Sequence, residues 1–189
     1  TDAFNTETIT GGAGADAIAL GGSHSGAMTL KYTTYNQGGA AIDANNNAAF
    51  PVGDTVSNFH VATDIINVNQ ATLGSFHAAV KASLPMVPWD MDSYTVYIDV
   101  NSLTNDYGLS ANPSAADLQN VVFNGGNFYA TLGNHGVYAV PTTASNTTYN
   151  IYQITANNTD YGNIDATDQI SLIGVYSTNG ALDVANFIA

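Results

Sequence analysis

The sequence predicts a mainly β fold: a short parallel β-roll followed by an antiparallel β region with one or two small helices. Three observations lead to this prediction. A glycine-rich repeat lies near the N-terminus, many downstream apolar residues alternate with polar ones, and only two segments have helical spacing. The 189 residues, 45% of them hydrophobic, suffice for the core of one domain or two small ones.

The glycine-rich repeat lies at residues 11–19. It fits the pattern G-G-x-G-x-D-x-U-x, in which U is a large apolar residue, here Ile18. The glycines allow tight turns that bring backbone carbonyl oxygens inward. Asp16 supplies an anionic oxygen, and Ile18 begins a short strand that points into the roll. Oxygens from adjacent turns form the kind of cage that Ca²⁺ prefers, so the repeat predicts a calcium site.

This repeat resembles that of the RTX proteins, which bacteria export by one-step type I secretion and which fold on meeting extracellular calcium. Nine residues upstream, Glu7 stands where Asp16 stands in the repeat, so residues 2–10 are expected to form a degenerate preceding turn. Downstream the pattern is kept only partly, since Gly26 takes the place of the Asp. The resemblance implies one or two calcium ions, with candidate ligands at Glu7, Gly12, Gly14 and Asp16.

The same glycines allow other interpretations. Residues 12–17 also satisfy the G-x-G-x-x-A fingerprint of dinucleotide sites, but that fingerprint opens a helix, and the glycines at 21–22 follow too soon. A glycine-rich turn that binds no metal is the plain structural alternative. Residues 21–25 lack the final glycine of a hydrolase nucleophile elbow, which is therefore not supported.

The charge of the chain is strongly acidic. Fifteen acidic residues stand against two basic ones, for a net charge of −13 and a pI near 4.1. Such a field repels nucleic acid and anionic membrane surfaces and attracts cations. No cysteine is available for a disulfide, whereas calcium bound only by the folded state would add stability. Because of this negative field we expect no nucleic-acid binding. The sequence has neither a membrane-length apolar run nor a signal peptide, so we expect no membrane insertion.

Residues 54–68 resemble the segment that closes RTX rolls, patterned D-x-I-x-D-F-x-x-G-x-D-x-I-x-L. Asp54 and Asp64 match acidic positions of that pattern, while Asn58 and Ala62 depart from it. The resemblance makes Asp54 and Asp64 further candidate calcium ligands. The alternative is a strand pair with two solvated carboxylates. Before this segment, the alternation over residues 27–35 predicts a strand.

Residues 69–150 carry no motif that indicates a function. Helical spacing predicts a short helix over 71–84, and a proline at the first turn predicts another over 113–120. Trp89 is expected to be a packed anchor, with a binding surface as the alternative. Alternation predicts further strands at residues 93–100, 128–132, 137–140, 149–155 and 169–175.

Residues 157–168 have Gly, Ile and an acid at three positions of an EF-hand loop. Asn, Thr and Tyr occupy the early ligand positions, where carboxylates are expected. An Asp- and Asn-rich turn before the next strand is the alternative. The apolar ending at 181–189 resembles the C-termini of RTX exports. Further candidate calcium ligands in the loop are Asp160, Asp165 and Asp168.

Together these features predict an extracellular, calcium-dependent structural protein, a subunit or anchoring domain of a bacterial surface layer, filament or adhesin. Residues 1–68 would form the degenerate roll and its cap and 69–189 the antiparallel region, unless both form one continuous domain. No catalytic set is visible, so we do not expect an enzyme. The alternative function is a secretion and folding module of a larger RTX enzyme, such as a protease or lipase.

The partners expected from the sequence are calcium and further copies of the chain, assembled into a lattice or filament. A cell-surface glycan is a third candidate partner, which rests on Trp89, the tyrosines and the Asn-rich loops. It would make the chain a carbohydrate-binding module.

Overall fold

The computed structural model describes residues 6–22, 24–32, 42–43, 53–68, 78–83, 89–90, 94–123, 128–129, 135–157, 164 and 168–188. This part of the chain is 47% strand and 8% helix, and it contains no helix of seven or more residues. The prediction of a mainly β fold is confirmed.

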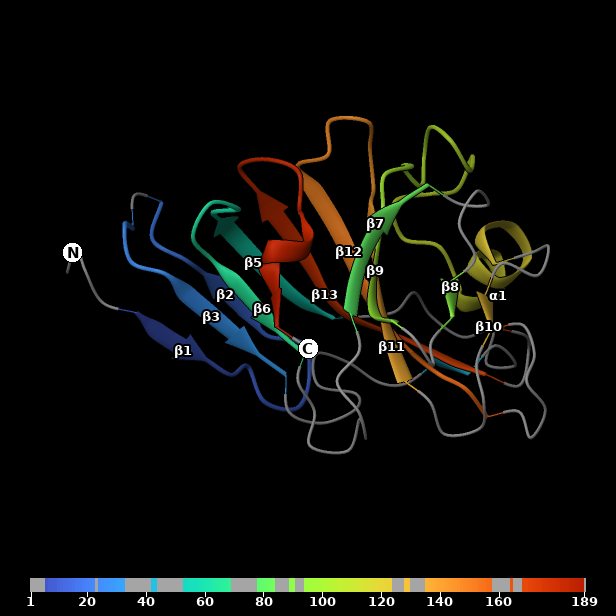
Figure 1. Ribbon diagram of the computed structural model, residues 1–189, viewed down its shortest axis with the longest axis horizontal. Helices are drawn as coiled ribbons and strands as arrows, with labels where there is room; N and C mark the ends of the chain where they lie inside the picture. The colour runs from blue at the N-terminus through green and yellow to red at the C-terminus, as the bar shows by residue number, and fades with distance from the viewer. Residues whose placement is uncertain are drawn as a thin grey trace.

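A parallel sheet of four strands forms one wall of a β-roll (Figure 1). Its strands are parallel to one another. Their order in the sheet is β1 (Glu7–Ile9), β3 (Met28–Lys31), β6 (Ile65–Asn67) and β14 (Phe187–Ile188).

Three parallel strands of a second sheet form the facing wall. They are β2 (Ala17–Ala19), β5 (Asp54–Phe59) and β13 (Gln169–Thr178). The chain visits the two walls alternately, in the order β1, β2, β3, β5, β6, β13, β14. Apolar side chains from both walls, among them Leu30 of β3 and Val56 of β5, share one core. The walls therefore enclose a roll, and its last coil comes from the C-terminus.

The second sheet continues beyond the roll. Strand β13 pairs antiparallel with β12 (Thr148–Thr155), which pairs antiparallel with β11 (His135–Pro141). Two further strands, β9 (Tyr94–Asp99) and β7 (Ala78–Ala82), are added in parallel to β11. The β region is thus antiparallel across β11–β12–β13 and parallel at its outer edge.

Two short pairings complete the described strands. Strand β4 (Ile42–Asp43) pairs with the start of β13, and β8 (Trp89–Asp90) pairs in parallel with β10 (Phe128–Tyr129). The strands predicted at 93–100, 137–140, 149–155 and 169–175 are present as β9, β11, β12 and β13. Those predicted at 27–35 and 128–132 are present as β3 and β10 where the chain is described.

The helix predicted over 71–84 is wrong for residues 78–82, which form β7. Residues 71–77 and 84 lie outside the described part. The helical pattern rested on four apolar residues, of which only Val80 falls within 78–82. Residues 78–82 are a strand because they pair in parallel with β9 at the edge of the sheet.

The second predicted helix is a short helical segment. Helix α1 (Ala115–Asp117) runs directly into the π-helical turn η1 (Leu118–Val122). Ser114 starts it, because the Asp117 amide donates to the Ser114 hydroxyl at 3.1 Å while the Ser114 amide donates to the Asp117 carboxylate at 3.0 Å. This reciprocal pairing is a capping box. A single 3₁₀ turn, η2 (Val184–Asn186), precedes β14.

Both faces of the large sheet are buried along β11, β12 and most of β13, whereas β2 and the outer face of β5 carry exposed residues. On β12, Ile151 belongs to the core inside the roll, whereas Tyr152 belongs to a second core with Tyr138 and Leu172. The sheet is thus the wall between two cores. Among the described residues no helix is long and apolar enough to span a membrane.

Candidate cation site between the first coils of the roll

The glycine turn at residues 10–16 joins β1 to β2. Gly12 and Gly14 have φ angles of +96° and +110°, a conformation that glycine adopts without the clash of a Cβ. The turn is hydrogen-bonded to the next coil, since the Thr55 amide donates to the Asp16 carbonyl at 2.8 Å. Gly12 and Gly14 therefore form the tight turn that the repeat predicts.

The carboxylates of Asp16 and Asp54 meet over this turn. Strand pairing of Ala17 with Thr55 puts the preceding residues, Asp16 and Asp54, side by side in adjacent coils. The Asp16 amide donates to Asp54 Oδ1 at 2.9 Å. A Cβ on Gly11 would lie 2.8 Å from Asp54 Oδ2 and 3.1 Å from Asp16 Oδ2. We call these two side chains the carboxylate pair.

Each member of the carboxylate pair has one unsatisfied oxygen. Asp54 is 1% exposed. The Oδ2 atoms of both Asp16 and Asp54 are buried and accept no hydrogen bond from any residue that the structure describes. Buried acceptors are normally satisfied, so such atoms call for an explanation.

The electrostatics of the pair disfavour a bare dianion. Burial raises the pKa of Asp54, and the neighbouring charge of Asp16 raises it further. The Asp16 amide and the nearby Tyr32 hydroxyl act in the opposite direction. Two adjacent carboxylates without a counter-ion repel one another, and a bound cation would remove that repulsion.

Calcium fits the donors of this pair. Ca²⁺ takes roughly six to eight oxygen ligands, including carboxylates, backbone carbonyls and waters. Within the described ranges no group of three or more His, Cys, Asp or Glu is arranged so that it could hold a metal ion by itself. The pair would therefore supply the acidic part of a site, with carbonyls and waters completing it.

Glu7 does not join the carboxylate pair. It lies exposed at the start of β1, in the opposite wall of the roll, and pairs in register with Met28. A step of nine residues moves the chain from one wall to the other, because Glu7 begins β1 and Asp16 directly precedes β2. The residue beside Asp16 in the same wall comes from the next coil, and it is Asp54.

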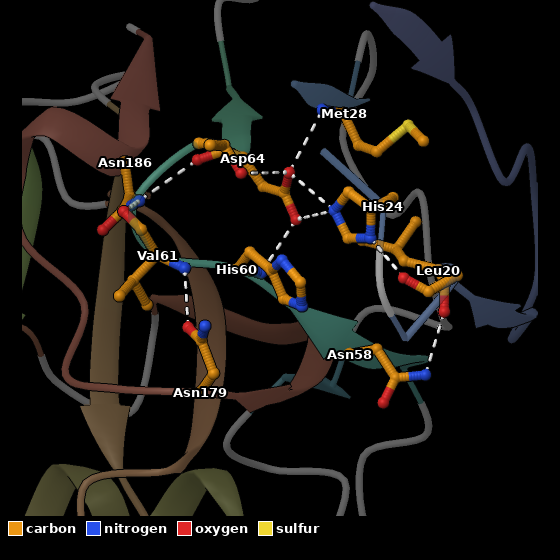
Figure 2. Close-up of polar contacts among 11 residues, drawn as sticks. Leu20, His24, Met28, Asn58, His60, Val61, Asp64, Asn179 and Asn186 are labelled. Atoms are coloured by element: carbon orange, nitrogen blue, oxygen red, sulfur yellow. Dashed lines mark hydrogen bonds and ion pairs between the residues drawn. The ribbon is translucent and has the colours of Figure 1, made fainter. Parts of the chain in front are cut away.

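Asp64 belongs to a different cluster, on the turns that connect β2 to β3 and β5 to β6 (Figure 2). It is fully buried and accepts hydrogen bonds from His24 Nε2 at 2.9 Å, the His60 amide at 2.8 Å and the Met28 amide at 3.1 Å. The rings of His24 and His60 stack with centroids 4.2 Å apart. We call His24, His60 and Asp64 the Asp64 cluster.

The Asp64 cluster is structural in its bonding. Asp64 Oδ1 also accepts a bond from the Thr63 hydroxyl at 3.2 Å, so both carboxylate oxygens have donors. Strand β5 separates it from the carboxylate pair, and six residues of strand span about 20 Å. Asp54 and Asp64, both matched to one closing pattern, therefore lie at opposite ends of β5.

Asparagines bind neighbouring turns together in the same region. Asn58, with φ of +61°, donates from Nδ2 to the Leu20 carbonyl at 2.9 Å. Asn186 donates to the carbonyls of Val61 and Asp64 at 2.8 and 3.1 Å (Figure 2). The departure of Asn58 from the RTX pattern has a physical consequence, since an aspartate carboxylate could not donate this bond.

Asp168, the candidate ligand near the C-terminus that the structure describes, is not brought to the carboxylate pair. Asp168 is buried just before β13 and accepts a hydrogen bond from the Asn157 amide at 2.8 Å. The residue of β13 that pairs with Asp54 is Gly174, six positions further along the strand. Two other candidate residues and one side chain lie outside the described part: Asp160, Asp165 and the side chain of Trp89.

A buried acid that the sequence interpretation missed is Asp99, at the end of β9. It is fully buried and accepts hydrogen bonds from the hydroxyls of Tyr107 at 2.5 Å and Tyr138 at 2.8 Å, and from the Asn101 amide at 2.8 Å. Burial raises the pKa of Asp99, while these donors lower it. Asp99 alternates with the apolar residues of β9, as a solvent-facing residue would, but residues 96–99 of this strand are all buried.

Comparison with protein-family models, with curated proteins and with solved structures found no match for this chain. The resemblance to RTX repeats therefore rests on the residues themselves, and the function must be argued from the site.

Proposed function

We propose that this chain is an extracellular, calcium-dependent structural protein, a subunit or anchoring domain of a bacterial surface layer, filament or adhesin. The observation that carries the proposal is the carboxylate pair, in which two buried and unsatisfied oxygens from adjacent coils converge over Gly11. Asp16 lies in the one intact repeat of the sequence, residues 11–19, and Asp54 comes from the predicted closing segment.

The choice of calcium follows from the donor chemistry. Carboxylate and carbonyl oxygens are hard ligands, which suit Ca²⁺ and Mg²⁺ rather than the softer transition metals. Mg²⁺ needs near-ideal octahedral geometry and keeps several waters, whereas Ca²⁺ accepts irregular cages with many protein oxygens. A buried pair beside a glycine turn therefore favours calcium.

The structural role follows from how the ion would act. Asp16 directly precedes β2 and Asp54 begins β5, so an ion between them would bind one coil to the next. A ligand that binds only the folded state stabilises it. In a chain with no cysteine and a net charge of −13, calcium would replace disulfides and offset repulsion together.

Calorimetric titration of calcium tests the proposal. Wild-type protein is expected to bind Ca²⁺, and both Asp16→Asn and Asp54→Asn are expected to lower the affinity at least about ten-fold, because each removes one charged ligand. The matched control is Asp106→Asn, which removes the same charge from an exposed side chain remote in sequence from the pair. Equal affinity in wild type and both pair variants would place the site elsewhere, and absence of binding to wild type would refute the calcium function.

A further inference from the structure

Two buried tyrosines connect the last coil of the roll to an earlier one. Tyr32 follows β3, and Tyr176 lies in β13. Their hydroxyl oxygens are 2.7 Å apart, although the residues are 144 positions apart in sequence. Tyr32 is 4% exposed and Tyr176 fully buried, so this hydroxyl pair is shielded from water.

Gly174 brings the hydroxyl pair beside Asp54. Gly174 of β13 is in register with Asp54 of β5. A Cβ on Gly174 would lie 2.7 Å from the ring of Tyr176 and 3.3 Å from the Tyr32 hydroxyl. The missing side chain thus makes room for the Tyr176 ring to lie back over the strand, toward the position of Asp54.

Asp54 and the two hydroxyls also interact electrostatically. Burial is the main reason that the pKa of each tyrosine is raised, and the charge of Asp54 raises both further. In turn, the Tyr32 hydroxyl favours the charged form of Asp54 and lowers its pKa. The three groups are therefore electrostatically coupled inside the roll.

We infer that the hydroxyl pair of Tyr32 and Tyr176 positions the Asp54 carboxylate for the cation, so that binding between the first coils depends on β13 of the last coil. The inference rests on the proposed calcium function and adds the residues that regulate its site. Asp54 Oδ1 is held by the Asp16 amide, and the nearby Tyr32 hydroxyl favours the charged form of the same carboxylate. Groups that orient a metal ligand commonly change metal affinity about 10–100-fold when removed.

Conservative variants of the full-length chain test this role. Tyr32→Phe and Tyr176→Phe each remove one oxygen and keep the ring. We expect each to weaken calcium binding about ten-fold in a calorimetric titration. If the two hydroxyls act as one unit, the effects of the two substitutions on calcium affinity are not additive. The double variant is then expected to bind calcium no more weakly than the single variant with the lower affinity.

The matched control is Tyr152→Phe. The Tyr152 hydroxyl is equally buried and accepts a hydrogen bond from Asn150 Nδ2 at 2.9 Å, but it lies in the other core of the sheet. This variant is expected to lower the melting temperature without changing the dissociation constant for calcium. A role in packing alone would give the same result for Tyr32→Phe and Tyr176→Phe.

A third variant tests the role of the hydroxyl pair without removing a hydroxyl. Gly174→Ala places a methyl group against the Tyr176 ring, so it is expected to displace the hydroxyl pair and weaken calcium binding. If wild type binds calcium and all three variants bind it equally well, the inference is wrong and the proposed function stands. If wild type binds no calcium, both fail. Should one variant not fold, the remaining two decide.

Discussion

Gly11 is the residue on which the geometry of the carboxylate pair depends most directly. Its neighbours Gly12 and Gly14 are needed for backbone conformation, since both have positive φ. Gly11 is not among the positive-φ glycines of the described residues, and its missing side chain instead leaves space beside two Oδ2 atoms. Two different physical demands therefore explain three glycines of one repeat.

Gly11→Ala is expected to weaken calcium binding while leaving the strands in place. The new methyl group would come within 2.8 Å of Asp54 Oδ2, closer than a carbon and an oxygen can approach, so a carboxylate must move. Gly21→Ala is the control, because its Cβ would meet nothing nearer than His24 Cβ at 3.9 Å. Calorimetry would measure both, and similar affinities for the two variants would contradict the assigned geometry.

His24 should make the stability of the fold depend on pH. The hydrogen bond to the Gly21 carbonyl raises the pKa of His24 above 6.5, burial opposes this, and Asp64 raises it further. A raised pKa in the folded state stabilises the protein fully below about 6.5, and this contribution is lost as pH rises through the raised value. His24→Gln is therefore expected to cost stability at pH 6 but much less at about pH 8.

The control for this measurement is His135→Gln. Burial lowers the pKa of His135 to about 4, so the folded state disfavours the charged form, and stability is lost as pH falls from about 6.5 toward 4. Its effect has the opposite sign and a lower pH window. Thermal melts of wild type and both variants across this range would separate them. A His24→Gln penalty that does not change between pH 6 and 8 would show that the proton is not involved.

At the scale of elements, the pairing of β2 with β5 joins two coils separated by many residues of chain. Only three residue pairs form this ladder, Ala17–Thr55, Ile18–Val56 and Ala19–Ser57. On its outer side β2 has no described neighbour in the sheet. Because this edge pairing is so short, a cation bound to both strands at their starts would contribute a large share of its stability.

Hydrogen exchange should show this local effect. Calcium at about 100 times its dissociation constant is expected to slow exchange of the Thr55 amide by up to about 100-fold, if local opening releases the ion. That amide donates to the Asp16 carbonyl beside the carboxylate pair. Amides between β11 and β12 provide the reference, since they lie far along the sheet. Uniform slowing across both regions would indicate global stabilisation instead.

At the scale of the whole molecule, the net charge of −13 opposes both folding and association. Calcium would reduce that repulsion within one chain and between chains. Both walls of the roll end together at β1 and β2, which are edge strands among the described residues. Neither strand carries the Lys or Pro that commonly blocks edge pairing.

Calcium-dependent assembly into a lattice or filament is therefore expected. Light scattering and electron microscopy across a calcium titration would measure it, with Asp16→Asn as the variant that should assemble less. Magnesium at equal concentration is the control for simple charge screening. A strictly monomeric particle at millimolar calcium and high protein concentration would favour the secretion and folding module of a larger enzyme.

The sequence by itself determined the parts of this protein that depend on local chemistry. The glycines of residues 11–19 predicted a tight turn, the alternation at 149–155 and 169–175 predicted strands, and Pro113 predicted a helical start. It also named Asp16 and Asp54 as candidate ligands, because each stands in a local pattern. These features can be predicted from the sequence because backbone conformation and the alternation of side chains between two faces are set by neighbours in the chain.

Only the tertiary structure decided which of those residues meet. The partner of Asp16 is 38 residues away, and strand pairing between coils selects Asp54 over Glu7 and Asp64. The same pairing converts residues 78–82 into an edge strand, buries Asp99 among tyrosines, and carries the C-terminal strands back into the roll. These outcomes depend on contacts between distant segments. The free energy of such contacts cannot be predicted from a local sequence pattern.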